Sequence, residues 1–183
     1  MRRHIAILSG VLALGFAIAM LGQSDVAKSA AVRLQLNEVQ AGSMASEQYC
    51  TVVFADHHFH SEKASRSHGK DTDRKVYEGQ LSEADWNALG GVIDSDGFRA
   101  LSVPQTVPPL VIQDAHTVTI SVARGVRFQN MEFLDNKSRK PYDSQLKPLL
   151  QWWKSFRGER PAESKAAPDA RCALDNSNAV VSF

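Results

Sequence analysis

The spacing of apolar residues predicts a helix over residues 80–101, around which the rest of the domain is arranged. The apolar positions with helical spacing are Trp86, Leu89 and Ile93. Side chains three and four residues apart share one face of a helix, so these positions predict a packed face. Ser82 is a suitable N-terminal cap, with Asp85 completing a capping box. Gly97 suits the left-handed conformation that ends helices, and we expect the helix to end there.

Alternating and β-branched stretches predict four strands, and a second apolar stripe predicts another helix. The predicted strands cover residues 49–59, 75–81, 116–123 and 126–134, and the second helix covers residues 145–157. Arg124 and Gly125 make a tight turn that pairs the last two strands as a hairpin, with a bulge near Gln129 and Asn130. The order β-β-α-β-β-α predicts an α+β domain of two layers, in which an antiparallel four-stranded sheet carries two helices on one face.

The composition divides the chain into four regions. Residues 1–31 are predicted to be a signal peptide or an N-terminal membrane anchor, and residues 49–158 the α+β domain. Residues 32–48 lack clean periodicity and are predicted to be a linker with at most a short strand at residues 32–36. Residues 159–183 are rich in Pro, Ala, Ser, Asp and Asn, which predicts a mostly disordered tail. With 183 residues and 43% hydrophobic content, the chain is long enough for one domain with a core.

The N-terminal residues have the pattern of an export signal. Arg2 and Arg3 precede an apolar run over residues 5–22, and small residues such as Ala27 and Ser29 follow at alternate positions that suit cleavage. We therefore expect an exported protein, either periplasmic or secreted. The alternative is an uncleaved anchor through residues 5–22, because roughly 20 apolar residues span a bilayer.

The balance of charged residues limits the classes of partner that the chain can attract. Its 21 Lys and Arg residues nearly balance its 20 Asp and Glu residues. Such a balance gives no overall field that would attract nucleic acid, so we expect no nucleic-acid partner. Contact with a membrane is expected only through the N-terminal segment, if that segment is not cleaved. The expected partner is another protein, whose identity the sequence does not name.

The chain contains two cysteines, Cys50 and Cys172. In an exported protein two cysteines permit one disulfide, which would attach the tail to the domain. The alternative is a pair of unrelated thiols, because spacing alone does not show that the two Cα atoms come within the ~7 Å that a disulfide requires.

One cluster has the character of a metal site. On an extended strand Asp56, His58 and His60 would project to the same side. Two imidazoles and a carboxylate are ligands for zinc or copper. The alternative is a surface cluster of histidines at a strand end. No phosphate loop, nucleophile elbow or metalloprotease helix occurs in the sequence, so no catalytic residue and no other cofactor is assigned.

Two residues are candidates for a binding surface. Val107 lies between prolines in residues 102–113, a loop that the prolines should hold extended. Trp152 is adjacent to Trp153, and only one of the two can face the core of a helical domain. If Trp153 is in the core, Trp152 is at the rim, and exposed tryptophans are enriched at binding hot spots.

From residue 75 to residue 157 the layout resembles the emfourin-like proteins, which are small inhibitors of thermolysin-type metalloproteases. The resemblance rests on the run Phe98-Arg99-Ala100-Leu101, on the hairpin, and on the run Leu146-Lys147-Pro148-Leu149-Leu150-Gln151-Trp152. The expected function is therefore an exported non-catalytic binding module, with a protease-inhibitor-like domain as its specific version. The alternative is a metal-binding or metal-dependent protein that uses Asp56, His58 and His60.

Overall fold

The computed structural model describes residues 31–42, 44–68, 70–104, 116–158 and 172. They form one antiparallel sheet of six strands in the order β4-β3-β2-β1-β5-β6. The strands are β1 (Val32–Ala41), β2 (Ala45–Phe54), β3 (His58–Ser67), β4 (Lys70–Gln80), β5 (His116–Arg124) and β6 (Arg127–Phe133). The helices are α1 (Glu83–Ile93), α2 (Asp96–Arg99), α3 (Asn136–Arg139), the 3₁₀ turn η1 (Lys140–Tyr142) and α4 (Asp143–Gly158).

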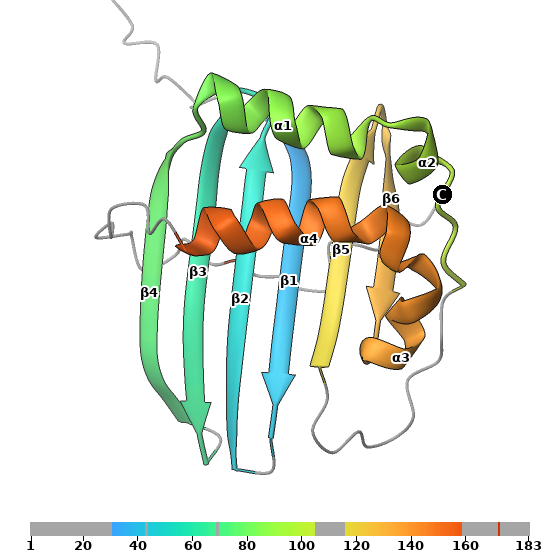
Figure 1. Ribbon diagram of the computed structural model, residues 1–183. Coiled ribbons are helices and arrows are strands. Elements are labelled where there is room, and N and C mark those ends of the chain that lie inside the picture. Colours follow the sequence, from blue (N-terminus) through green and yellow to red (C-terminus); the bar gives the residue numbers. More distant parts are fainter. Residues whose placement is uncertain (1–30, 43, 69, 105–115, 159–171, 173–183) are drawn as a thin grey trace, which may run out of the picture.

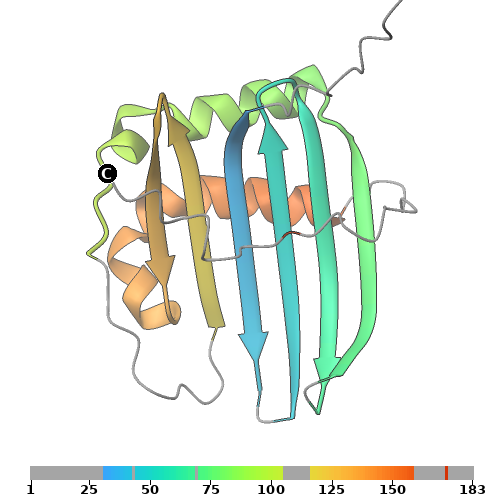
Figure 2. The same cartoon turned by 180° about the vertical axis from the view of Figure 1, so that it is seen from behind.

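The two long helices lie across one face of the sheet. In Figure 1, α1 crosses one end of the strands and α4 crosses their middle. Figure 2 shows the opposite face, which carries no helix of the described chain. The core lies between α1, α4 and the sheet, and its buried residues include Leu34, Leu36, Leu89, Ile93, Phe98, Ile120, Phe133, Leu146, Leu149 and Trp153. The arrangement is α+β, as expected.

The predicted four-stranded sheet is wrong, because the sheet has six strands. Residues 32–48, predicted as a linker, form β1 and the beginning of β2, and β1 lies inside the sheet between β2 and β5. Leu34 and Leu36 do alternate as core positions of a strand. The next inward position is Glu38, a buried acid. That acid interrupts the apolar alternation by which strands are recognised.

Residues 49–59, predicted as one strand, belong to two. The chain leaves β2 at Phe54, turns through a residue with positive φ, His57 (φ 71°), and returns as β3. Residues 61–73, which lie between the predicted strands 49–59 and 75–81, form most of β3 and the beginning of β4. These strands are polar because they reach beyond α4, where no helix of the described chain covers them (Figure 1).

The helix predicted over residues 80–101 begins as expected and ends early. The Ser82 hydroxyl accepts a hydrogen bond from the Asp85 amide at 3.1 Å, which confirms the N-terminal cap. The helix ends at Asp94, and Ser95 caps the short helix α2 by accepting from the Phe98 amide at 3.3 Å. Gly97 therefore lies inside α2, and its assignment as the stop is wrong.

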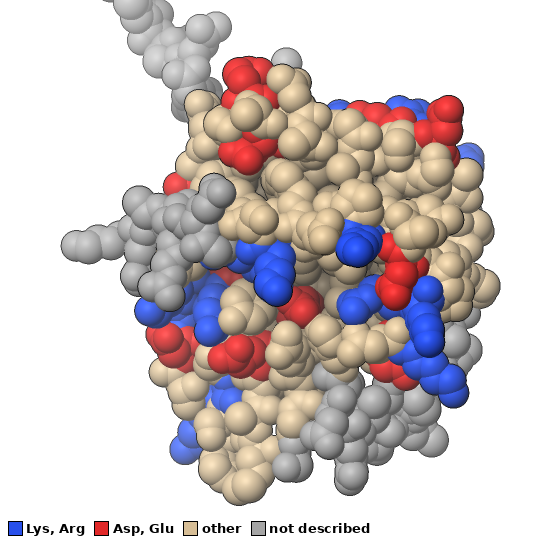
Figure 3. Space-filling view, in the orientation of Figure 1, with Lys and Arg blue, Asp and Glu red and all other residues tan. Residues whose placement is uncertain are grey.

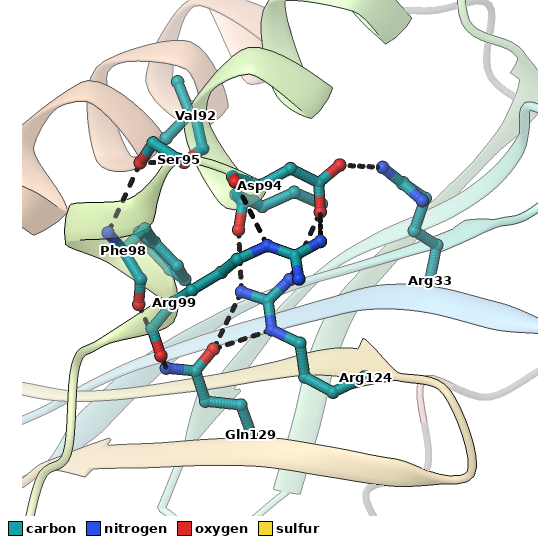
Figure 4. A network of polar contacts seen from close by, with 9 residues as sticks. Arg33, Val92, Asp94, Ser95, Phe98, Arg99, Arg124 and Gln129 are labelled. Atoms are coloured by element: carbon teal, nitrogen blue, oxygen red, sulfur yellow. Dashed lines mark hydrogen bonds and ion pairs between the residues drawn. The ribbon is translucent and has the colours of Figure 1, made fainter.

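Asp94 connects the corner between α1 and α2 to two parts of the sheet (Figure 4). Its carboxylate accepts from Arg33 of β1 at 2.6 Å, from Arg99 at 3.2 Å and from Arg124 of β5 at 3.3 Å. Arg124 also donates to the Ile93 carbonyl at 2.7 Å, and Gln129 of β6 donates to the Leu101 carbonyl at 2.8 Å. These polar contacts fix the end of α1 over β1 and the hairpin.

The β5–β6 hairpin is confirmed, and the bulge in it is not. The pairing of β5 with β6 is continuous from Val118 opposite Phe133 to Arg124 opposite Arg127, without a shift near Gln129. Regular pairing puts Met131 and Phe133 in the core and leaves Phe128 half exposed on the other face. Phe128 therefore points to one face of a regular strand, and Met131 and Phe133 point to the other.

Among the described residues, no helix is long and apolar enough to cross a membrane. Apart from Ala31, the export signal or anchor predicted over residues 1–31 lies outside the described residues, as does all of the tail except Cys172.

Candidate functional site

On the face of the sheet that carries the helices, two rows of side chains run across strands β1 to β4. The first row consists of Leu36, Thr51, Ser61 and Tyr77, each opposite the next. The second row, two residues further along each strand, consists of Glu38, Tyr49, Lys63 and Lys75. The first row contains two buried hydroxyl groups, those of Thr51 and Ser61, and the second row ends at β3 and β4 in two lysines. A polar end of this kind on a core face is unusual, and it marks the candidate site.

Helix α4 covers the first row and satisfies its buried hydroxyl groups. The indole Nε1 of Trp153 donates to Thr51 Oγ1 at 2.8 Å, and Thr51 and Ser61 share a hydrogen bond of 2.9 Å. The Ser61 hydroxyl also lies 3.0 Å from the Cys50 carbonyl. Because these contacts lock α4 against the strands, the C-terminal end of α4 has a fixed position beside the second row.

Glu38 anchors the second row and is only 8% exposed. Its carboxylate accepts from His116 Nε2 at 2.6 Å and from Arg157 Nη1 at 2.5 Å. Burial alone raises the pKa of Glu38, but the hydrogen bonds from His116 and Arg157 outweigh burial and hold the pKa below its ordinary value of 4.5. Glu38 therefore keeps its charge and holds the Arg157 guanidinium over the sheet.

The depressed pKa of Glu38 makes the fold sensitive to acid. A carboxyl group whose pKa is lower when folded stabilises the protein above its unfolded pKa, and this stability is lost as the pH falls below about 4.5 through the folded pKa. We expect Glu38→Gln to be less stable than the wild type at pH 7, and to lose less stability than the wild type between pH 5 and pH 3. Urea unfolding across this range measures the difference; parallel losses in the two proteins would contradict the assignment.

A pocket of about 250 Å³ lies between the C-terminal end of α4 and strands β2 to β4. Figure 3 shows basic and acidic side chains gathered beneath α4 on the β4 side of the molecule. The pocket is lined by Tyr49, Ser61, Glu62, Lys63, Asp73, Lys75, Tyr77, Phe156 and Arg157. Its wall thus combines three cationic side chains with three aromatic rings.

The cationic side chains of the pocket differ in their partners. Arg157 is paired with Glu38 and lies over the Tyr49 ring at 4.5 Å. Lys63 is 3.4 Å from Glu47, and its contacts with Tyr49 and then Glu47 raise the pKa of the ammonium group. Lys75 is half buried directly opposite Lys63, and it has no hydrogen bond or ion pair within the described part of the chain. The pocket therefore holds one cation without a counterion.

A second polar cluster lies on the face opposite the helices. His60 Nδ1 is 3.0 Å from Glu78 Oε1, and His60 Nε2 is 2.7 Å from Glu62 Oε1. Arg74 donates to both carboxylate oxygens of Glu62, at 2.9 and 3.0 Å, and the Cys172 amide donates to Glu62 Oε1. Burial raises the pKa of Glu62, but the hydrogen bonds from Arg74, His60 and Cys172 together lower it below its ordinary value. Glu62 is therefore a buried carboxylate at the centre of this cluster.

The two cysteines lie beside this second cluster. The Sγ atoms of Cys50 and Cys172 are at disulfide distance, 2.15 Å apart, with Cα atoms 6.0 Å apart. Of the two alternatives for these cysteines, the bonded pair is the one observed. The disulfide is consistent with export, because disulfides persist in oxidising compartments.

The structure separates the members of the predicted metal set. Asp56 and His58 lie together, with His58 Nδ1 3.1 Å from Asp56 Oδ2, both exposed at the beginning of β3. His60 is buried further along the strand, and both of its ring nitrogens face glutamates. Within the described chain, the group close enough to share a metal ion is His60, Glu62 and Cys172.

Of the two residues predicted to form a binding surface, the structure describes only Trp152. Val107 lies outside the described residues, and its role stays a prediction. Trp152 is half buried and stacks on Phe156, with ring centroids 5.4 Å apart. It therefore packs beside the pocket wall and does not stand free on the surface.

No protein-family model matches the chain, and no curated protein matches it in sequence. A fold alone does not determine an activity, so function is inferred from the site itself.

Proposed function

We propose that this protein is an exported, non-catalytic binding module that takes an anionic group in the pocket beneath α4. The observation that carries the proposal is the position of Lys63 and Lys75, which are directly opposite each other on paired strands. Like charges in this position destabilise a sheet, by roughly 0.2–1 kcal/mol for such a pair. Local choices that oppose stability are expected at functional sites.

An anion between the two lysines would remove this repulsion. Glu47 already pairs with Lys63, and Glu38 pairs with Arg157, so Lys75 is the ammonium group that a ligand would neutralise. Asp73 lies on the same strand, two residues from Lys75, but the two side chains are not within ion-pair distance. A carboxylate or phosphate oxygen suits an ammonium point charge of this kind.

The aromatic side chains of the pocket indicate what is attached to the anionic group. Tyr49, Tyr77 and Phe156 border the pocket together with the lysines. Its volume of about 250 Å³ is slightly below the range of roughly 300–1,000 Å³ for sites that take drug-sized ligands. The ligand is therefore a small carboxylate or phosphate on a planar or apolar body, either as a free molecule or as a side chain presented by a protein partner.

Titration with phenyl phosphate and benzoate tests the proposal, with uncharged benzamide as the comparison ligand. We expect Lys75→Met to weaken binding of both anions at least about tenfold, because each 1.4 kcal/mol of lost interaction corresponds to a factor of ten. Lys147→Met is the matched control, because Lys147 is exposed near the other end of α4. Asp73→Asn should strengthen binding, since it removes a negative charge from the pocket wall. Equal binding of benzamide, or no difference between the two lysine variants, would refute the proposal.

In the absence of a ligand, Lys75→Met should stabilise the protein. Lys75→Met removes the repulsion from Lys63 and keeps the length of the side chain, so we expect the free energy of unfolding to rise by about 0.2–1 kcal/mol. Urea unfolding at low salt measures the gain, and added salt should reduce it because salt screens the repulsion. A loss of stability would show instead that Lys75 is neutralised by another part of the chain.

The resemblance to emfourin-like proteins supports a more specific version, in which the partner is a thermolysin-type metalloprotease. The residues that carry the resemblance include Phe98, Leu146 and Leu149, which are buried in the core, so they support a related packing without naming an inhibitory residue. The purified protein at micromolar concentration should then inhibit members of a panel of such proteases. If every enzyme of the panel keeps full activity, this version is wrong, and the anion pocket remains to be tested by titration.

A further inference from the structure

The disulfide and its polar neighbours bring four metal-binding side chains to one point on the sheet face opposite the helices. Cys50 on β2 is directly opposite Glu62 on β3, and His60 is two residues from Glu62 on the same face. The ligand atoms of His60, Glu62 and Cys172 all lie within 4.8 Å of one another, and Cys50 Sγ is bonded to Cys172 Sγ. We infer that reduction of the Cys50–Cys172 disulfide converts this cluster into a zinc site with Cys50, Cys172, His60 and Glu62 as ligands.

The ligand set has the chemistry and geometry that zinc prefers. Zinc takes four ligands in a tetrahedron from thiolate, imidazole and carboxylate groups, with Zn–S distances of about 2.3 Å. In such a tetrahedron the two sulfurs lie about 3.8 Å apart. Two unbonded sulfurs cannot remain at disulfide distance, so reduction itself moves them toward the separation that a metal ion requires.

His60 is already oriented as a zinc ligand. Its Nδ1 is 3.0 Å from Glu78 Oε1, while Nε2 faces Glu62. In the zinc-bound form the ring keeps its proton on Nδ1 and donates to Glu78, and the Nε2 lone pair binds the metal in place of the present hydrogen bond to Glu62. A carboxylate behind a ligating histidine is the usual outer-shell partner in zinc sites, where it fixes the tautomer and the ring orientation.

Charge and position also favour the metal-bound state. Two thiolates and the Glu62 carboxylate around Zn²⁺ leave one negative charge, and Arg74 already contacts both oxygens of Glu62. Three of the ligands come from adjacent paired strands, which hold them in place without the disulfide. The fourth, Cys172, is also held by the hydrogen bond from its amide to Glu62.

The chemical steps balance with a dithiol as the reductant. The S–S bond takes two electrons and two protons from the dithiol, which becomes a cyclic disulfide, and two free thiols form on the protein. Zinc binding then releases both thiol protons, because the thiolate is the ligand. The oxidised protein holds no thiolate at these positions, so the redox state decides whether the site exists.

Zinc binding by the oxidised and the reduced protein tests the inference. Protein reduced with dithiothreitol and freed of it under argon should bind one Zn²⁺ per chain, and the oxidised protein less than a tenth of that. Co²⁺ should give thiolate charge-transfer absorption in the reduced protein alone. His60→Gln and Cys172→Ser should each lose stoichiometric binding. His58→Gln is the matched control and should bind zinc like the wild type, because His58 is exposed and faces Asp56.

Several results would overturn the inference. They are equal zinc binding in both redox states, Co²⁺ spectra without thiolate absorption, full binding by Cys172→Ser, or loss of binding in His58→Gln. If His60→Gln does not fold, Cys172→Ser and the Co²⁺ spectra still decide the outcome. The side chains of Lys63 and Lys75 project to the opposite face of the sheet from those of His60 and Glu62, so zinc binding and the anion titration test different side chains.

Discussion

Replacing Trp153 by alanine is expected to lower the free energy of unfolding by about 3–5 kcal/mol, the range for removing a large aromatic side chain from a core. Trp153 is 1% exposed, donates its indole proton to Thr51 and lies under the Arg157 guanidinium, 4.3 Å from its ring. The substitution therefore creates a cavity and leaves the buried Thr51 hydroxyl without the hydrogen bond that it accepts from the indole. Urea unfolding, followed by far-ultraviolet circular dichroism, measures the loss.

Trp86→Ala is the matched comparison for Trp153→Ala. Trp86 is only half buried and stacks on His57, with ring centroids 4.1 Å apart, and the Arg33 guanidinium is 4.8 Å from its ring centroid. Truncating a partly exposed ring leaves a smaller cavity, so we expect a clearly smaller loss than for Trp153. If Trp86→Ala is the more destabilising of the two, the core is centred on α1 and the role assigned to α4 is wrong.

Removing the disulfide by Cys50→Ala with Cys172→Ala should lower the free energy of unfolding by about 2–5 kcal/mol. The bond joins residues 122 positions apart, and closing so long a loop restricts the unfolded chain strongly. Loss of the disulfide also weakens the hydrogen bond from the Cys172 amide to Glu62, which is buried on the face without helices.

Reductant provides the control for the disulfide. Dithiothreitol should destabilise the wild type by about the same amount as the double substitution, and should leave the double variant unchanged, both in the presence of a chelator. A loss below about 1 kcal/mol on removing the bond would show that Cys172 adds little to the folded domain.

The parts of the fold that the sequence predicted are those with one clearly apolar face. The start of α1, the β5–β6 hairpin and α4 each bury a regular stripe against the core, and each was predicted close to its observed place. Strand β1 was predicted at most as a short strand over residues 32–36, because Glu38 takes the next inward position and its partners Arg157 and His116 come from distant parts of the chain. Local pattern carries no information about such partners.

The strand predicted over residues 75–81 is the second half of β4, whereas most of β3 and the first half of β4 were missed for a different reason. Along the part of these strands beyond α4, both faces are polar, so the alternation that identifies a half-buried strand is absent. The pocket depends on the same polar stretch. Lys63 and Lys75 are twelve positions apart and become neighbours only through the register of β3 with β4, which a single sequence does not specify.

The turn at His57 separates the residues that were predicted to bind a metal ion together. The hypothesis required Asp56, His58 and His60 to share an extended strand. His57 instead adopts a positive φ of 71°, so Asp56 precedes the strand and His60 meets Glu62 and Glu78. His60 belongs to both the predicted and the inferred metal sets, but its neighbours could be found only from the pairing of the strands.

A crystal structure of the protein with phenyl phosphate would show whether the pocket beneath α4 binds anions. We expect phosphate density between the Nζ atoms of Lys63 and Lys75, with the phenyl ring against Tyr49, Tyr77 or Phe156. A pocket filled by residues of the same chain, or phosphate bound only elsewhere on the surface, would contradict it.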